Sequence, residues 1–158
     1  MKKLLTLVLA VMMLCSVPVT AFAATDLDKN HTEGSMTVSY GVDEGYVVTI
    51  PADVTVSTAG VETNLSANSV LLPDGKTLTV SVASANDFKL EYAGSKIPYT
   101  VSVGSTQQTT ATFTALSILS GTTSGSVKLT FKTTQNDIDK ATKAGNHTDT
   151  LTFTCGVN

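Results

Sequence analysis

The chain has 158 residues, with ten lysines, thirteen acidic residues, neither arginine nor tryptophan, and a formal net charge of −3. This balance argues against nucleic-acid binding, because the chain offers neither a basic patch nor an arginine that could read a base edge. It argues equally against attachment to anionic lipid through clustered cations.

Residues 1–23 have the three parts of a secretory signal peptide. A basic start, Lys2-Lys3, precedes an apolar run over residues 4–19, and Ala21-Phe22-Ala23 supplies the small residues of a cleavage site. We therefore expect cleavage before Ala24 and a secreted or extracellular protein that is at most loosely associated with the cell wall. The apolar run is shorter than the ~20 residues of a membrane span, so we predict no span after cleavage.

Residues 24–35 are polar and predict a flexible leader, and residues 36–158 predict a single β-sandwich domain. In this domain apolar and polar residues alternate, which is typical of strands with one buried face. The alternating apolar residues are Met36, Val38 and Tyr40; Tyr46, Val48 and Ile50; Val54 and Val56; Leu78, Val80 and Val82; Phe88, Leu90 and Tyr92; Tyr99, Val101 and Val103; Ala111, Phe113 and Ala115; Val127, Leu129 and Phe131; and Leu151, Phe153 and Cys155.

Turn sequences separate most of these short segments, among them Asp43-Glu44-Gly45 and Pro73-Asp74-Gly75. Strands at this spacing, without amphipathic helices between them, predict an all-β fold. We expect an Ig-like antiparallel β-sandwich of about 7–9 strands. At most one short helical turn is expected near residues 136–144, capped by Asn136.

Two stretches besides the signal peptide resemble known exported proteins. Residues 46–56 read YVVTIPADVTV and residues 144–154 read AGNHTDTLTFT. Both are similar to small exported Ig-like surface proteins of Gram-positive bacteria, including WxL-type wall-associated proteins and some pilin-like subunits. The chain departs from the WxL pattern in having no Trp, and His147 replaces the usual Tyr. The resemblance implies a surface-associated β-sandwich and carries no catalytic residue across.

Cys155 is the one cysteine left after cleavage, and His147 is the nearest candidate base for it. However, alternation places Cys155 on the face of Leu151 and Phe153, so we expect a small core residue. An intermolecular disulfide through Cys155 stays open. No set of nucleophile, base and oxyanion donors can be assembled, so we predict no catalytic residue and no enzyme.

Two acidic stretches are the candidates for a metal. Asp26-Leu27-Asp28 opens like a calcium loop, but His31 and Thr37 stand where the turn glycine and the bidentate glutamate belong. Residues 136–139, Asn-Asp-Ile-Asp, could offer oxygens to a hard cation but suit a helix N-terminus equally. We predict no cofactor and no metal ligands, with a structural calcium ion as the one alternative left open.

The four tyrosines fall on the inward parity of their strands, which favours core or rim positions. Tyr46 and Tyr99 lie near strand starts and are the two candidate contact residues for a sugar or protein ligand.

These observations favour a non-catalytic secreted or cell-surface protein acting in adhesion, in surface-layer or matrix structure, or in protein–protein contact, with an extracellular protein or glycan as partner. The alternatives are a carbohydrate-binding module and a pilin-like self-assembling subunit. For the latter, residues 24–34 contain only Leu27 as a large aliphatic residue, so an N-terminal donor strand is missing, and a swapped strand over residues 149–155 remains.

Overall fold

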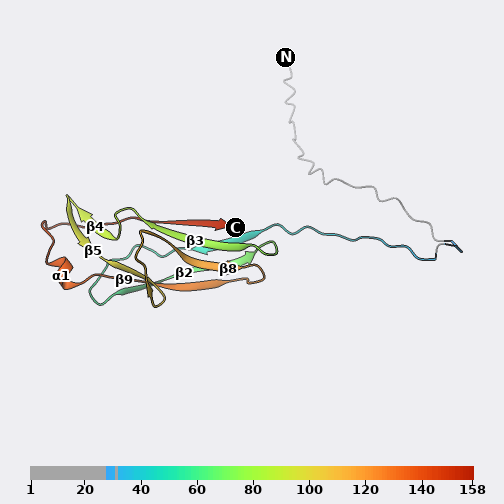
Figure 1. The fold of residues 1–158 in the computed structure, drawn as a ribbon, viewed down its shortest axis with the longest axis horizontal. Helices are drawn as coiled ribbons and strands as arrows, with labels where there is room; N and C mark the ends of the chain where they lie inside the picture. The colour runs from blue at the N-terminus through green and yellow to red at the C-terminus, as the bar shows by residue number, and fades with distance from the viewer. Residues whose placement is uncertain (1–27, 31) are drawn as a thin grey trace, which may run out of the picture. The chain divides into compact units, whose positions relative to one another are not determined.

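The computed structural model describes residues 28–30 and 32–158, so the predicted signal peptide and Asp26-Leu27 lie outside the described residues. The chain divides into two compact units, Met1–Tyr40 and Gly41–Asn158. All the strands of the described residues belong to the second unit (Figure 1). The expectation of an antiparallel all-β fold is confirmed.

The larger of the two main sheets has five strands in the spatial order β1-β2-β9-β6-β7. Every neighbouring pair is antiparallel. Its strands are β1 (Gly45–Thr49), β2 (Val61–Leu71), β6 (Thr100–Val103), β7 (Thr106–Gln107) and β9 (Gly125–Lys132).

The smaller main sheet has the order β10-β3-β8, again antiparallel, and a separate hairpin is formed by β4 and β5. The strands of this three-stranded sheet are β3 (Thr77–Ser84), β8 (Thr112–Leu119) and β10 (Leu151–Val157). The hairpin strands are β4 (Lys89–Tyr92) and β5 (Ser95–Pro98). The hairpin and the helical turn lie at one end of this unit, and the C-terminus at the other (Figure 1).

The core lies between the two main sheets. It is built from the inward residues of both, chiefly Leu65, Val101, Leu129 and Phe131 from the five-stranded sheet and Leu78, Val80, Val82, Phe113 and Ile118 from the three-stranded sheet. Burial of these side chains supplies the main favourable free energy of folding, because each removes apolar surface from water.

Two segments that the alternation assigned to strands are not strands. Residues 32–44 are in no strand, and Met36, Val38 and Tyr40 are 83%, 82% and 92% exposed. Residues 51–56 also lack ladder pairing, although Val54 and Val56 pack partly against the core, and a single bridge joins Ser57 to Lys132. Alternation shows that a segment can pair, but pairing also needs a neighbouring strand with free backbone groups.

The helical turn is confirmed but begins earlier than predicted. It is α1 (Gln135–Ile138), and its cap is Thr134, not Asn136. The Thr134 hydroxyl accepts a hydrogen bond from the Asp137 N–H at 3.2 Å and donates one to the Asp137 carboxylate at 2.6 Å. This reciprocal pair satisfies an N–H group that the helix itself leaves without a partner. Among the described residues, α1 is the one helix, and its four residues are far too few to cross a membrane.

Candidate functional site

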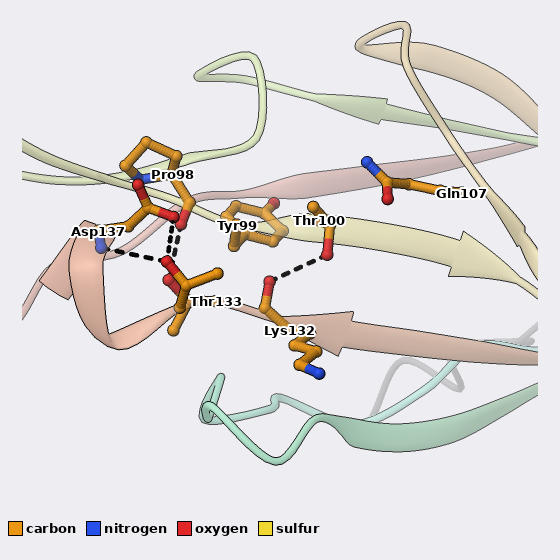
Figure 2. Close-up of a pocket in the computed structure, with 8 residues that line it drawn as sticks. Pro98, Tyr99, Thr100, Gln107, Lys132, Thr133 and Asp137 are labelled. Carbon is orange, nitrogen blue, oxygen red and sulfur yellow. Dashed lines mark hydrogen bonds between the residues drawn. The ribbon is translucent and has the colours of Figure 1, made fainter.

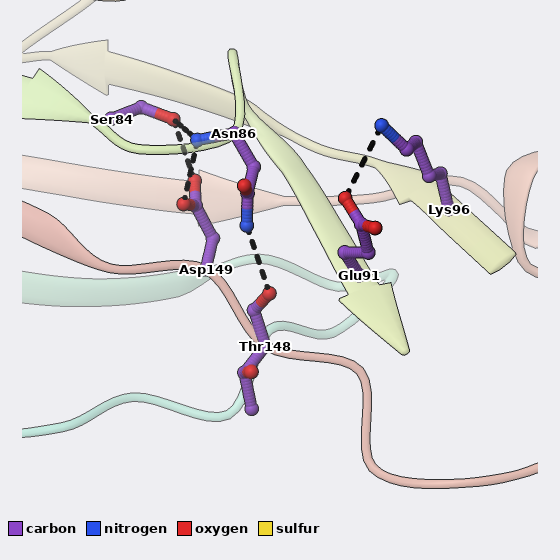
Figure 3. A network of polar contacts seen from close by, with 6 residues as sticks. All are labelled: Ser84, Asn86, Glu91, Lys96, Thr148 and Asp149. Atoms are coloured by element: carbon purple, nitrogen blue, oxygen red, sulfur yellow. Dashed lines mark hydrogen bonds and ion pairs between the residues drawn. The ribbon is translucent and has the colours of Figure 1, made fainter. Parts of the chain in front are cut away.

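A polar cluster forms where β3 ends, β6 begins and β10 is about to begin. The Asp149 carboxylate accepts hydrogen bonds from the hydroxyls of Ser84, at 2.6 Å, and Tyr99, at 2.7 Å. It also accepts the backbone N–H groups of Asn86 and Thr150. Figure 3 shows the carboxylate facing Ser84 and Asn86. Four donors on one half-buried carboxylate leave it no lone pair directed at a ligand.

Tyr99 belongs to this cluster and not to the surface. Its side chain is 6% exposed, and its ring packs edge-on to Phe88 with centroids 5.8 Å apart. Burial, aided by the hydrogen bond to Asp149, raises the pKa of the Tyr99 phenol well above its usual value. The Tyr99 ring is therefore a core element and its hydroxyl anchors Asp149, which leaves little of the side chain exposed; its role as a contact residue stays a prediction.

The other candidate contact residue, Tyr46, lies on the edge strand β1 and is 39% exposed. It lies within the register shift between Gly45 and Val47, so its strand is irregular there. Its partial exposure leaves it available for contact, and its role stays a prediction.

The structure pairs His147 with a serine that the sequence did not single out. Its Nε2 lies 3.0 Å from the Ser95 hydroxyl, and its Nδ1 lies 3.1 Å from the Gly145 carbonyl oxygen. Because a carbonyl only accepts, Nδ1 carries the proton and Nε2 accepts from Ser95. This has the arrangement of a serine activated by a base.

The surroundings of Ser95 nevertheless give the pair a structural role. Ser95 is 2% exposed, so no substrate carbonyl could reach its oxygen. That oxygen also accepts the N–H groups of Thr142 and Lys143, at 3.0 and 3.3 Å. The pair therefore ties the loop that follows α1 to the start of β5, and its two members, 52 residues apart, have no common sequence motif.

A shallow pocket of about 250 Å³ lies beside β6, the end of β9 and α1 (Figure 2). Pro98, Tyr99, Thr100, Gln107, Lys132, Thr133, Thr134 and Asp137 line it. Its threonines bond to the protein itself: Thr133 donates to the Pro98 carbonyl at 2.8 Å, and Thr100 donates to the Lys132 carbonyl at 3.1 Å. These hydroxyl protons are therefore committed to neighbouring strands and do not point at a ligand.

In both candidate metal stretches, carboxylates of the described residues accept hydrogen bonds from the protein itself. Asp137 accepts the Thr134 hydroxyl at 2.6 Å and pairs with Lys140 at 3.7 Å, and Asp139 accepts from Gln135 at 2.8 Å. In the leader, the Asp28 carboxylate accepts the Asn30 N–H at 2.7 Å. Among residues 28–30 and 32–158, no group of three or more His, Cys, Asp and Glu side chains is placed to hold a metal ion.

The exposure of Cys155 contradicts the prediction that it is a small core residue. It shares the inward parity of Leu151 and Phe153, but its side chain is exposed. The reason is its strand: β10 is the edge of the three-stranded sheet, and Leu151 and Phe153 are themselves only half-buried there. Parity fixes the face of the sheet, whereas burial also requires a layer that covers that part of the face.

The outer face of the β10-β3-β8 sheet is the most distinctive exposed surface. Not one residue of its three strands carries a charge. The strand register places small residues, most of them hydroxyl-bearing, side by side on this face, in the rows Thr152–Ala83–Thr112, Thr154–Ser81–Thr114 and Gly156–Thr79–Ser117. We call it the hydroxyl face. By contrast, the five-stranded sheet exposes a charged pair, Lys128 and Glu62, at 2.8 Å.

Comparison with known proteins yields no relative. No protein-family profile matches the chain, and neither a curated protein nor a solved structure matches it.

Proposed function

We propose that this chain is a non-catalytic exported protein that is retained at a cell surface or in an extracellular matrix through contacts made by its hydroxyl face. The observation that carries the proposal is the absence of charge across β3, β8 and β10 together with their rows of Thr and Ser. Charged residues are depleted from the centres of protein interfaces, because desolvating them costs free energy.

The chemistry of the face suits an extended, uncharged partner. Threonine and serine hydroxyls both donate and accept hydrogen bonds, and the threonine methyl groups add apolar contact. An uncharged glycan or a polar protein surface offers matching groups. The predicted signal peptide supports export, and the resemblance of residues 46–56 and 144–154 supports an Ig-like surface protein of a Gram-positive bacterium.

The polar clusters support a non-catalytic role. Asp149, Ser95 and His147 are the residues best suited to acid–base or nucleophilic chemistry, and each is bonded to its own fold. In an enzyme we would expect at least one such group to face a cavity that a substrate can enter.

Fractionation of the native culture tests the proposal. We expect the protein in the wall extract or matrix, and we expect Thr114→Lys to move most of it into the medium. Thr114 is exposed on β8 within the hydroxyl face, and Lys there buries a charge in the contact. Ser126→Lys is the control, because it adds the same charge at an exposed site on the five-stranded sheet.

A wild-type protein found wholly in the medium, or equal retention of the Thr114→Lys and wild-type proteins, would contradict the proposal. A glycan array, run with and without a chelator, then identifies the partner class. Binding on the array assigns a glycan, and a blank array assigns a protein.

A further inference from the structure

Residues 36–42, Met-Thr-Val-Ser-Tyr-Gly-Val, form a strand-like sequence without a strand partner. Met36, Val38, Tyr40 and Val42 alternate with small residues and are 69–92% exposed. We call these residues the 36–42 segment. It carries no charge and lies between Glu33 on one side and Asp43-Glu44 on the other. Uncharged alternating segments with charged flanks are typical of sequences that pair with a sheet when an edge is offered.

The edge strand β10 offers such an edge. It pairs only with β3, over seven residues and without a register shift. It contains no charged residue, proline or bulge, which are the usual protections of an exposed edge. The other edges of the two main sheets are less open: β1 has a register shift and β7 has two residues. On β8 the core-facing residues Phe113, Ala115, Leu116 and Ile118 are at most 9% exposed.

The backbone register shows which groups of β10 are free to pair. Thr77 and Asn158 exchange both hydrogen bonds at 3.0 Å, so alternate residues back from Asn158 face β3. The N–H and C=O groups of Leu151, Phe153, Cys155 and Val157 therefore point away from β3. The side chains of these residues also lie on the core side, where they are half-buried or exposed. A strand added here would pair four residues and cover four side chains.

We propose that the 36–42 segment of one copy of this chain adds as a strand to β10 of a second copy. The segment has as many residues as β10, and its four apolar side chains match the four incompletely covered positions of that strand. Parity excludes a one-residue slip, because such a slip would turn all four apolar side chains to solvent. This inference rests on the proposed function, and it names a second copy as one protein partner.

The short connection to β1 favours the β10 strand of a second copy over that of the same chain. Only Asp43 and Glu44 separate Val42 from Gly45, where β1 begins in the five-stranded sheet. Packed sheets lie about 10 Å apart, and three Cα steps span at most about 11 Å. Crossing to the other sheet would use nearly all of this length and leave none for a reversal of direction. Since donor and edge are different surfaces, the contact is heterologous and leads to closed rings or open chains of subunits.

Light scattering after size-exclusion chromatography tests the inference on residues 24–158, the predicted mature chain. We expect the mass to rise with protein concentration. Val38→Lys/Tyr40→Lys should weaken association at least ten-fold, because it places charge on the covered face of the segment. Thr37→Lys/Ser39→Lys, with the same added charge on the opposite parity, should weaken it much less.

A second pair of variants addresses the edge. Cys155→Pro removes an N–H that points away from β3, so the ladder to β3 is retained while the edge loses a donor. We expect it to block association, whereas Cys155→Ala should associate like the wild type. The decisive measurement mixes the two blocked proteins. Val38→Lys/Tyr40→Lys keeps a working edge and Cys155→Pro keeps a working segment, so the mixture should give heterodimers although neither protein associates alone.

A wild-type chain that stays monomeric at the highest concentration would overturn the inference, as would equal weakening by the two lysine pairs. If Cys155→Pro does not fold, the lysine pairs still decide, because the 36–42 segment lies outside all the strands of the described residues. Surface retention is measured separately with Thr114→Lys on β8. A monomeric wild type that is retained would therefore refute the strand addition and leave the proposed function standing.

Discussion

The Tyr99 hydroxyl donates a 2.7 Å hydrogen bond to the carboxylate of Asp149, 50 residues further along the chain. This contact joins the start of β6, in one main sheet, to the approach to β10, in the other. It is made by a buried ring and a half-buried carboxylate, and so it is protected from competing water.

The first prediction concerns the contribution of this contact to stability. Tyr99→Phe removes a donor to a charged acceptor and keeps the ring, so we expect a loss of about 1.5–3 kcal/mol in the free energy of unfolding. Asp149→Ala should cost at least as much, because it leaves the Ser84 and Tyr99 hydroxyls without their acceptor. Urea denaturation measures both. Tyr40→Phe, at an exposed residue outside the strands, is the control and should be neutral.

The raised pKa of Tyr99 gives a second prediction, on alkaline stability. The unfolded phenol loses its proton near pH ~10, whereas the folded one keeps it. The unfolded state then binds fewer protons, so stability falls as pH rises above ~10, by up to about 1.4 kcal/mol per pH unit for this group. Tyr99→Phe should flatten the fall measured by urea denaturation between pH ~9 and ~11. An unchanged slope in this variant would show that other groups cause it.

The Ser95–His147 pair gives a third prediction. His147→Ala leaves the buried Ser95 hydroxyl without an acceptor, so we expect a loss of about 1–3 kcal/mol and faster proteolysis in the loop after α1. His147→Gln, whose amide oxygen can accept, should recover part of the stability. Equal losses in the two variants would show that the ring contact with Tyr92, and not the hydrogen bond, accounts for the effect.

Gly145 provides a fourth prediction, because a Cβ at this position would overlap the Tyr92 ring. Its φ of +156° also lies at the margin of the region that favours glycine. We expect Gly145→Ala to cost about 1–3 kcal/mol by overpacking. Adding Tyr92→Ala removes the ring, so the double variant should lose less than the two single losses combined. Strict additivity in denaturation experiments would contradict the overlap.

The exposure of Cys155 gives a fifth prediction. A thiol reagent should label the folded protein at a rate close to that of the urea-unfolded chain, because the side chain is exposed on an edge strand. If the reagent labelled Cys155 only after unfolding, the side chain would be buried, as the alternation predicted. Under oxidising conditions the exposed thiol is also available for an intermolecular disulfide, which non-reducing electrophoresis would detect.

Sequence reasoning located most of the strands but not the longest. The strands β3, β9 and β10 were predicted from the alternation of large apolar residues with polar ones, a pattern that indicates a half-buried strand. The strand β2, Val61–Leu71, was missed because Thr63 and Ala67 occupy two of its inward positions and the parity changes at Ser69, which has a positive φ. Its burial comes from lying between β1 and β9, and position within a sheet is not encoded in the strand's own pattern.

The candidate sites were less predictable than the strands. Asp149 meets Tyr99 and Ser84 across 50 and 65 residues, and Ser95 meets His147 across 52. Such distant pairs have no spacing rule, because the sheets that bring them together are set by the whole chain. The hydroxyl face could be foreseen from its Thr-rich strands, but its rows required the register between them.

The sequence by itself determined the all-β class and the face of each strand, and it predicts the export signal, since all of these depend on local pattern. The tertiary structure alone decided which strand-like segments pair and which inward positions are covered. Residues 36–40 and Cys155 show the difference: both have a regular alternation, and both are exposed. Pairing and burial require a partner strand and an opposing layer, and these come from distant parts of the chain or, as we propose for the 36–42 segment, from a second copy of it.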